Sequence, residues 1–165
     1  MPMRAVLIDA SVFCRAFFIK EHKGIAIVQL LQRLWEECYS FIISEQLLDE
    51  YRRCIKDEGF EGAMLVHRFV ESMGSKAIEV VVIQDEIDEA IRRNPKLEAI
   101  EEDVPHLIAA QKGGAEFCLF IEEAVEFRAE AIKRGLGVKI MSINALNDED
   151  RGPKCIESRI PLPFP

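Results

Sequence analysis

The sequence predicts a three-layer α/β domain with a five-stranded, mainly parallel sheet. Short apolar runs alternate along the chain with stretches in which apolar residues recur at helical spacing. This is the pattern of a sheet covered by helices on both faces. The chain has 165 residues, of which 49% are hydrophobic and 30% charged, a size and balance typical of one domain with a single core. We therefore assign residues 1–147 to this domain and residues 148–165 to a proline-containing C-terminal tail.

The first strand and the clearest helix lie in the N-terminal quarter of the chain. Residues 5–8 are an apolar run that is followed by Asp9, as expected of a strand buried on both faces with a polar residue at its carboxyl end. Ser11 stands where a helix N-cap would. After Gly24, residues 27–38 carry apolar side chains at i, i+3, i+4, i+7, i+8 and i+11, which predicts a helix that faces the core.

Glu50 lies on the helix that is predicted to follow the second strand. That strand is the apolar run at residues 41–43, and Ser44 can cap a helix whose apolar stripe includes Leu47 and Tyr51. At about 100° per residue, Glu50 falls about 60° from Leu47, on the border of this stripe. A carboxylate at that position can point along the edge of the sheet instead of into bulk solvent.

The remaining strands and helices alternate to the end of the domain. Asp103 comes two residues before Pro105, a residue type that suits the first turn of a helix, so Asp103 is placed at or just before a helix N-terminus. Glu122 comes directly after the fourth predicted strand. The strands are predicted at residues 77–83, 117–121 and 138–142, and the helices at residues 64–73, 86–93, 98–112 and up to 134.

The net charge of −8 argues against general electrostatic binding of nucleic acid, which clustered lysine and arginine usually provide. No apolar run approaches the roughly 20 residues of a membrane-spanning helix, and the N-terminus lacks the apolar core of a signal peptide. We therefore expect a cytoplasmic protein without membrane association. The five cysteines are scattered and form no CxxC motif, so they suggest neither a disulfide framework nor a zinc site, and we interpret most of them as buried thiols.

Four acidic residues occupy positions that converge on one edge of such a sheet. Right-handed crossovers place the carboxyl ends of parallel strands at the same edge, where open α/β sheets bind ligands. Carboxylates crowded there repel one another, and a hard divalent cation such as Mg²⁺ or Mn²⁺ relieves the repulsion. Chance placement or helix capping is the alternative, and Asp9 is the residue that no predicted helix cap needs. The candidate metal ligands and catalytic residues are Asp9, Glu50, Asp103 and Glu122.

Four sequence blocks resemble, in this order, those of PIN-domain proteins: Val6–Ser11, Ile42–Arg53, Asp103–Ala110 and Gly114–Glu122. The resemblance spans residues 4 to about 146. It implies a Rossmann-like fold with a five-stranded parallel sheet and Mg²⁺- or Mn²⁺-dependent cleavage of RNA, as in toxins of the VapC type. For a toxin it also implies an antitoxin partner that fills the acidic cleft.

The same resemblance implies that Asp9, Glu50, Asp103 and Glu122 bind the metal. The fourth block departs from the family's pattern, because Phe120 stands where a hydroxyl residue is usual and Glu122 where Asp is commoner. Glu123 can compete with Glu122 for the role.

Three hypotheses of function remain open. The first is a metal-dependent endoribonuclease. The second is a PIN-fold RNA- or protein-binding module with impaired catalysis, which the departure at Phe120 and the acidic charge favour. The third is a phosphatase-like or receiver-like domain with Asp9 as phosphate acceptor. It lacks the second Asp of such phosphatases, since Ser11 stands there, and Lys139 lies inside the last strand instead of at its end.

Three other features have two interpretations each. His106, three residues after Asp103, lies either near a scissile phosphate or at a helix surface where it forms a hydrogen bond. Arg52 and Arg53 either contact phosphates or belong to a solvated helix face. The tail is either free or an arm that lies on another surface, and the second alternative predicts a homo-oligomer, most simply a dimer.

Overall fold

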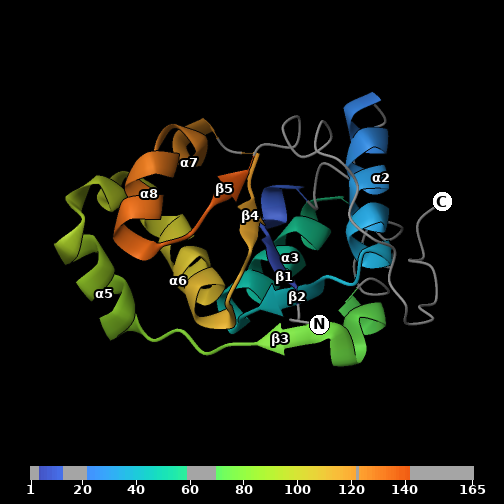
Figure 1. Ribbon diagram of the computed structural model, residues 1–165, viewed down its shortest axis with the longest axis horizontal. Helices are drawn as coiled ribbons and strands as arrows, with labels where there is room; N and C mark the ends of the chain where they lie inside the picture. Colours follow the sequence, from blue (N-terminus) through green and yellow to red (C-terminus); the bar gives the residue numbers. More distant parts are fainter. Residues whose placement is uncertain (1–3, 13–21, 59–69, 122, 142–165) are drawn as a thin grey trace.

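A computed structural model describes residues 4–12, 22–58, 70–121 and 123–141, and its centre is a five-stranded sheet (Figure 1). The strand order is β3-β2-β1-β4-β5, and each neighbouring pair is parallel. The predicted α/β class with a parallel sheet is therefore confirmed, with β1 as the central strand. The strands are β1 (Ala5–Ile8), β2 (Ser40–Ile43), β3 (Ala77–Glu79), β4 (Phe117–Leu119) and β5 (Ile140–Met141).

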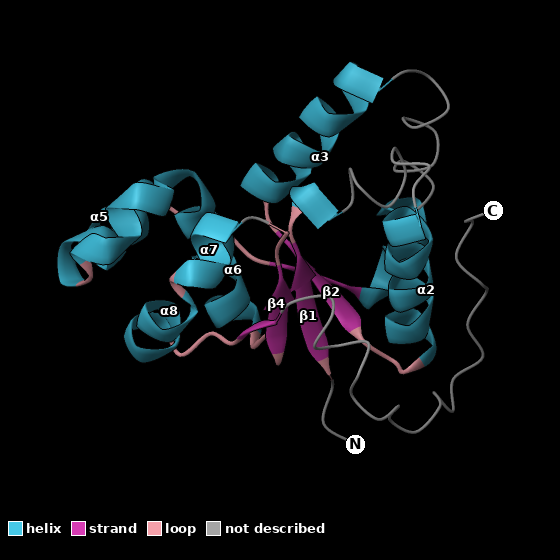
Figure 2. Ribbon diagram, turned by 90° about the horizontal axis from the view of Figure 1, so that it is seen from above, coloured by secondary structure: helices cyan, strands magenta, loops and turns pink. Residues whose placement is uncertain are grey.

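Helices cover both faces of this sheet. Figure 2 shows α2 on one side of the strands and α5, α6, α7 and α8 on the other. Within the described ranges, no helix is both long and apolar enough to cross a lipid bilayer. The helices are α2 (His22–Glu36), α3 (Glu45–Glu58), α5 (Gln84–Arg93), α6 (Val104–Gly113), α7 (Glu123–Phe127) and α8 (Ala129–Leu136), with 3₁₀ segments η1 (Gly74–Lys76) and η2 (Pro95–Asp103).

The core forms where the sequence pattern places it. All four residues of β1 and of β2 are buried, as expected of central strands with helices on both faces. Four residues of the predicted stripe, Leu30, Leu31, Leu34 and Trp35, are buried in α2, and Trp35 stacks on Phe41 of β2 with a centroid separation of 6.1 Å. These contacts join α2 to the sheet and confirm a core-facing helix there, although it ends at Glu36 and Cys38 lies in the turn that follows.

Several predicted elements differ in extent, among them the fourth strand, which ends at Leu119, and the fifth strand, which begins at Ile140. The third strand ends at Glu79, and the following residues Val81 and Ile83 are exposed. The helix predicted over 98–112 is divided into η2 and α6, because the backbone leaves helical geometry at Ile100 and Pro105 marks the first turn of a new helix. The last helix is divided at Arg128 into α7 and α8. Most of the predicted helix at 64–73 and the tail at 148–165 lie outside the described residues.

Two cysteines are in different chemical states. Cys118 in β4 is a free, fully buried thiol, and its burial raises its pKa. Cys38 is disulfide-bonded, which differs from the interpretation that the sequence supports for most of the cysteines. The scattered spacing of the cysteines in the sequence therefore did not predict the disulfide of Cys38.

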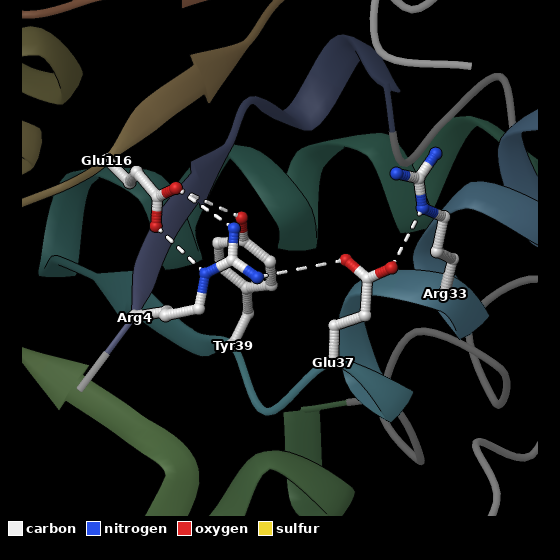
Figure 3. Close-up of polar contacts among 5 residues, drawn as sticks. All are labelled: Arg4, Arg33, Glu37, Tyr39 and Glu116. Atoms are coloured by element: carbon white, nitrogen blue, oxygen red, sulfur yellow. Dashed lines mark hydrogen bonds and ion pairs between the residues drawn. The ribbon is translucent and has the colours of Figure 1, made fainter. Parts of the chain in front are cut away.

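A network of charged groups joins the amino ends of β1 and β4 to the end of α2 (Figure 3). The guanidinium of Arg4 donates two hydrogen bonds to Glu116, at 3.1 and 3.0 Å, and lies 4.2 Å from the ring centroid of Tyr39. Glu37, which is buried, accepts from Arg33 at 3.1 Å and lies 4.0 Å from Arg4. Burial, followed by the nearby Glu116 carboxylate, raises the pKa of Tyr39 to about 12. This network stabilises the edge of the sheet opposite the carboxyl ends of the strands.

Candidate metal centre

Asp9 leaves the carboxyl end of the central strand and is almost completely buried, with 1% of its surface exposed. Its backbone N–H donates to the carbonyl of Leu119 at 3.0 Å, which continues the β1–β4 pairing to this residue. Its side-chain Oδ2 accepts hydrogen bonds from the backbone N–H and the hydroxyl of Ser11. Its other oxygen, Oδ1, has no hydrogen-bond partner among the described residues.

The contacts of Asp9 correct two predictions of the sequence, namely that Ser11 caps the following helix and that no helix cap needs Asp9. Residues 10–12 are already helical, and the carboxylate of Asp9, not the hydroxyl of Ser11, caps them by accepting the backbone N–H of Ser11 at 3.0 Å. The Ser11 hydroxyl instead joins Asp9 to the end of β4, since it also accepts the backbone N–H of Ile121 at 3.4 Å. Capping therefore accounts for Oδ2 and leaves Oδ1 unexplained.

Glu50 is held beside Asp9 by the first turns of α3. Ser44 caps this helix as predicted, because its hydroxyl accepts the backbone N–H of Leu47 at 3.2 Å. The hydroxyl of the buried Tyr51 donates to the carbonyl of Ile8 at 2.6 Å. Since Ile8 precedes Asp9 and Tyr51 follows Glu50, this bond fixes the two carboxylates near each other.

His106 reaches the same place from α6, which contacts α3. It lies in the first turns of α6 with 1% of its surface exposed, so the alternative of a helix-surface histidine is wrong. Its Nε2 is 2.9 Å from Oε1 of Glu50. That contact is not a hydrogen bond, because neither ring nitrogen has a hydrogen-bond partner within the part of the chain that is described.

Asp9, Glu50 and His106 together offer three ligand atoms that all lie within 4.8 Å of one another. Such a group could hold a metal ion. The Oδ1 of Asp9, which accepts no hydrogen bond from a described residue, and the one lone-pair nitrogen of a neutral His106 fit this use, because a bound cation satisfies a buried lone pair that no described donor reaches. Two carboxylates and one imidazole are ligands that divalent metals accept.

The electrostatics of the group favour a cation. Burial is the main cause that raises the pKa of Asp9 above its usual range, and repulsion from Glu50 adds to it; the hydrogen bond from Ser11 and the nearby His106 oppose this shift. Burial, then the charges of Asp9 and Glu50, raise the pKa of Tyr51 as well. A divalent ion between the carboxylates lowers the free energy of their charged forms and removes this penalty.

The remaining predicted metal ligands are Asp103 and Glu122. Asp103 is buried at the N-cap of α6, as predicted, and its side chain makes no capping hydrogen bond. It lies three residues before His106 but is not one of the three residues that share the 4.8 Å group. Glu122 lies outside the described residues. Metal binding by Asp103 and Glu122 therefore stays a prediction.

No protein-family model and no curated protein matches this chain. The resemblance to PIN-domain proteins is therefore still a prediction, and the chemistry of the site has to be argued from its own residues. His106 is the member of the group that sequence reasoning left with two interpretations. The available signal was its spacing of one helical turn from Asp103, which places both residues near the same end of one helix.

Proposed function

We propose that the protein is a PIN-type, metal-dependent nuclease that hydrolyses phosphodiester bonds in RNA with Mg²⁺ or Mn²⁺ as cofactor. The observation that carries this proposal is the buried, unpartnered Oδ1 of Asp9 beside Glu50 and His106. These residues lie past the carboxyl ends of β1 and β2, the edge at which open parallel sheets bind their ligands. An uncompensated carboxylate there is costly unless it binds a cation.

The residues of the chain provide the binding and orientation that such a reaction needs. A divalent cation at this site supplies Lewis-acid activation of a water molecule and offsets the charge that builds on the phosphodiester. Asp9, Glu50 and His106 hold it, and Ser11 fixes the orientation of the Asp9 carboxylate through Oδ2. Asp103 and Glu122 are further acidic residues that the PIN resemblance adds to the proposal.

RNA as the substrate is supported by the resemblance of the four sequence blocks, and one feature of α3 agrees with a phosphate ligand. Arg53 is exposed and lies three residues after Glu50, so the two side chains leave neighbouring positions on the helix surface. Arg52 is also exposed but pairs with Asp49 at 2.9 Å. We therefore assign a phosphate contact to Arg53, which positions the strand without reading its sequence.

The test is cleavage of mixed-sequence single-stranded RNA by the purified full chain with Mn²⁺, with Mg²⁺ and with EDTA. We expect cleavage with metal, none with EDTA, and loss of at least about a hundredfold in rate for Asp9→Asn, because the site loses a charged ligand. Asp85→Asn, an exposed aspartate of α5, is the matched control and keeps the rate. RNA that stays intact with every metal refutes the nuclease and leaves the binding module as the better hypothesis.

A further inference from the structure

His106 is a buried histidine whose imidazole ring forms no hydrogen bond with a described residue. It lies on α6 with buried apolar residues on either side of it in the sequence, among them Val104 and Leu107. A neutral imidazole has one donor and one acceptor nitrogen, and both lack a hydrogen-bond partner among the residues described. Leaving such groups unsatisfied in a buried position costs free energy, because each has lost its hydrogen bonds with water. A bound metal ion that accepts the imidazole lone pair removes part of this cost.

The distance between His106 and Glu50 matches two ligands of one ion. Their nearest atoms, Nε2 and Oε1, are 2.9 Å apart, although the ring nitrogen does not form a hydrogen bond with that oxygen. Two donor atoms that bind one ion at about 2.1 Å and at right angles are about 3.0 Å apart. The distance of 2.9 Å between Nε2 and Oε1 is short for two atoms that form no hydrogen bond. It is the normal distance between two neighbouring ligand atoms of a six-coordinate ion.

The nitrogen donor decides which metals fit best. Mg²⁺ prefers oxygen ligands and keeps much of its water, whereas imidazole suits the first-row transition metals, whose affinity for mixed nitrogen and oxygen sites is higher. We infer that His106 is a direct metal ligand and that the group formed with Asp9 and Glu50 selects Mn²⁺, Co²⁺ or Zn²⁺ over Mg²⁺. This inference uses the site of the proposed function but not its reaction, since it concerns binding alone.

The first experiment titrates the metal-free full chain with Co²⁺ and follows visible absorption, and then adds a large excess of Mg²⁺. We expect one Co²⁺ per chain, not displaced by Mg²⁺, and an affinity at least about tenfold lower in His106→Gln. The matched controls are His22→Gln and His67→Gln, the other two histidines of the chain, which keep the wild-type affinity. Equal affinity in His106→Gln, or ready displacement by Mg²⁺, overturns the inference.

A second measurement does not depend on the folding of any variant. Electron spin-echo spectroscopy of the Mn²⁺-loaded wild type detects a directly bound imidazole nitrogen, and ¹⁵N-labelled histidine changes that signal. Absence of the nitrogen signal overturns the inference even if RNA is cleaved with Mg²⁺. Tight Co²⁺ binding through His106 in a protein that leaves RNA intact upholds it and refutes the proposed function, so the two failures are distinguishable.

Discussion

Asp9→Asn should stabilise the metal-free protein while removing its ability to bind metal. The carboxylate is 1% exposed and its Oδ1 has no partner among the residues described, a situation that costs about 1–3 kcal/mol. The carbonyl oxygen of an Asn can keep both contacts with Ser11, and its amide can donate to Glu50 in place of the present repulsion. We expect a gain of about 1 kcal/mol, equivalent to a rise of about 2–4 °C in Tm for a chain of this size.

Thermal unfolding followed by circular dichroism tests this in two buffers. In EDTA the Asp9→Asn protein should melt above the wild type. With Mn²⁺ at about a hundred times its Kd, the wild type gains about 2.7 kcal/mol and the variant gains little, so the order reverses. Asp85→Asn, the exposed control, should melt with the wild type in both buffers. A variant that melts clearly below the wild type in EDTA would falsify the reasoning, because the charge of Asp9 would then be structural.

The pH dependence of the difference in stability between Asp9→Asn and the wild type is a second test of the same reasoning. The pKa of Asp9 is raised above 3.8 in the folded protein, mainly by burial. The folded state therefore binds this proton more tightly than the unfolded state, and the contribution of Asp9 to stability falls as the pH rises from 3.8 through the folded pKa. The advantage of Asp9→Asn in EDTA should be present at neutral pH and disappear below about pH 3.8. An advantage that grows in acid contradicts the assigned direction.

Three further predictions concern the scaffold. Glu37→Gln leaves two arginines without their shared charge (Figure 3) and should cost about 1–3 kcal/mol in urea unfolding, whereas a change near zero shows that the network is inert. Gly113→Ala places a Cβ 2.7 Å from the buried side chain of Ile42 and should cost about 1–3 kcal/mol in the same assay, less when combined with Ile42→Val. In Tyr51→Phe, the remaining Tyr39 should titrate near pH 12 by ultraviolet absorbance, and ionisation near 10 contradicts its burial.

The central strands and helix α2 could be predicted because each of their sequence patterns is compatible with one type of element only. A run such as residues 5–8 has no polar face and must be a central strand, and the stripe of α2 contrasts with polar residues around it. The rotation of α6 could not be predicted in this way. Its residues 106–110 are all buried, so no contrast between polar and apolar positions indicates which side chain faces the site. Sequence reasoning favoured Asp103 there, while the structure brings His106 together with Asp9 and Glu50 in the group that could hold a metal ion.

The two explanations of Asp9 make different demands on its charge. As a helix cap, Asn serves about as well as Asp, because the cap needs only one oxygen acceptor. Capping uses Oδ2, and that contact would survive the loss of the negative charge. A cap therefore does not account for a buried carboxylate that carries a second, unpartnered oxygen beside Glu50. A cation accounts for both the charge and the second oxygen, which is why replacing the carboxylate by its neutral amide separates the two explanations.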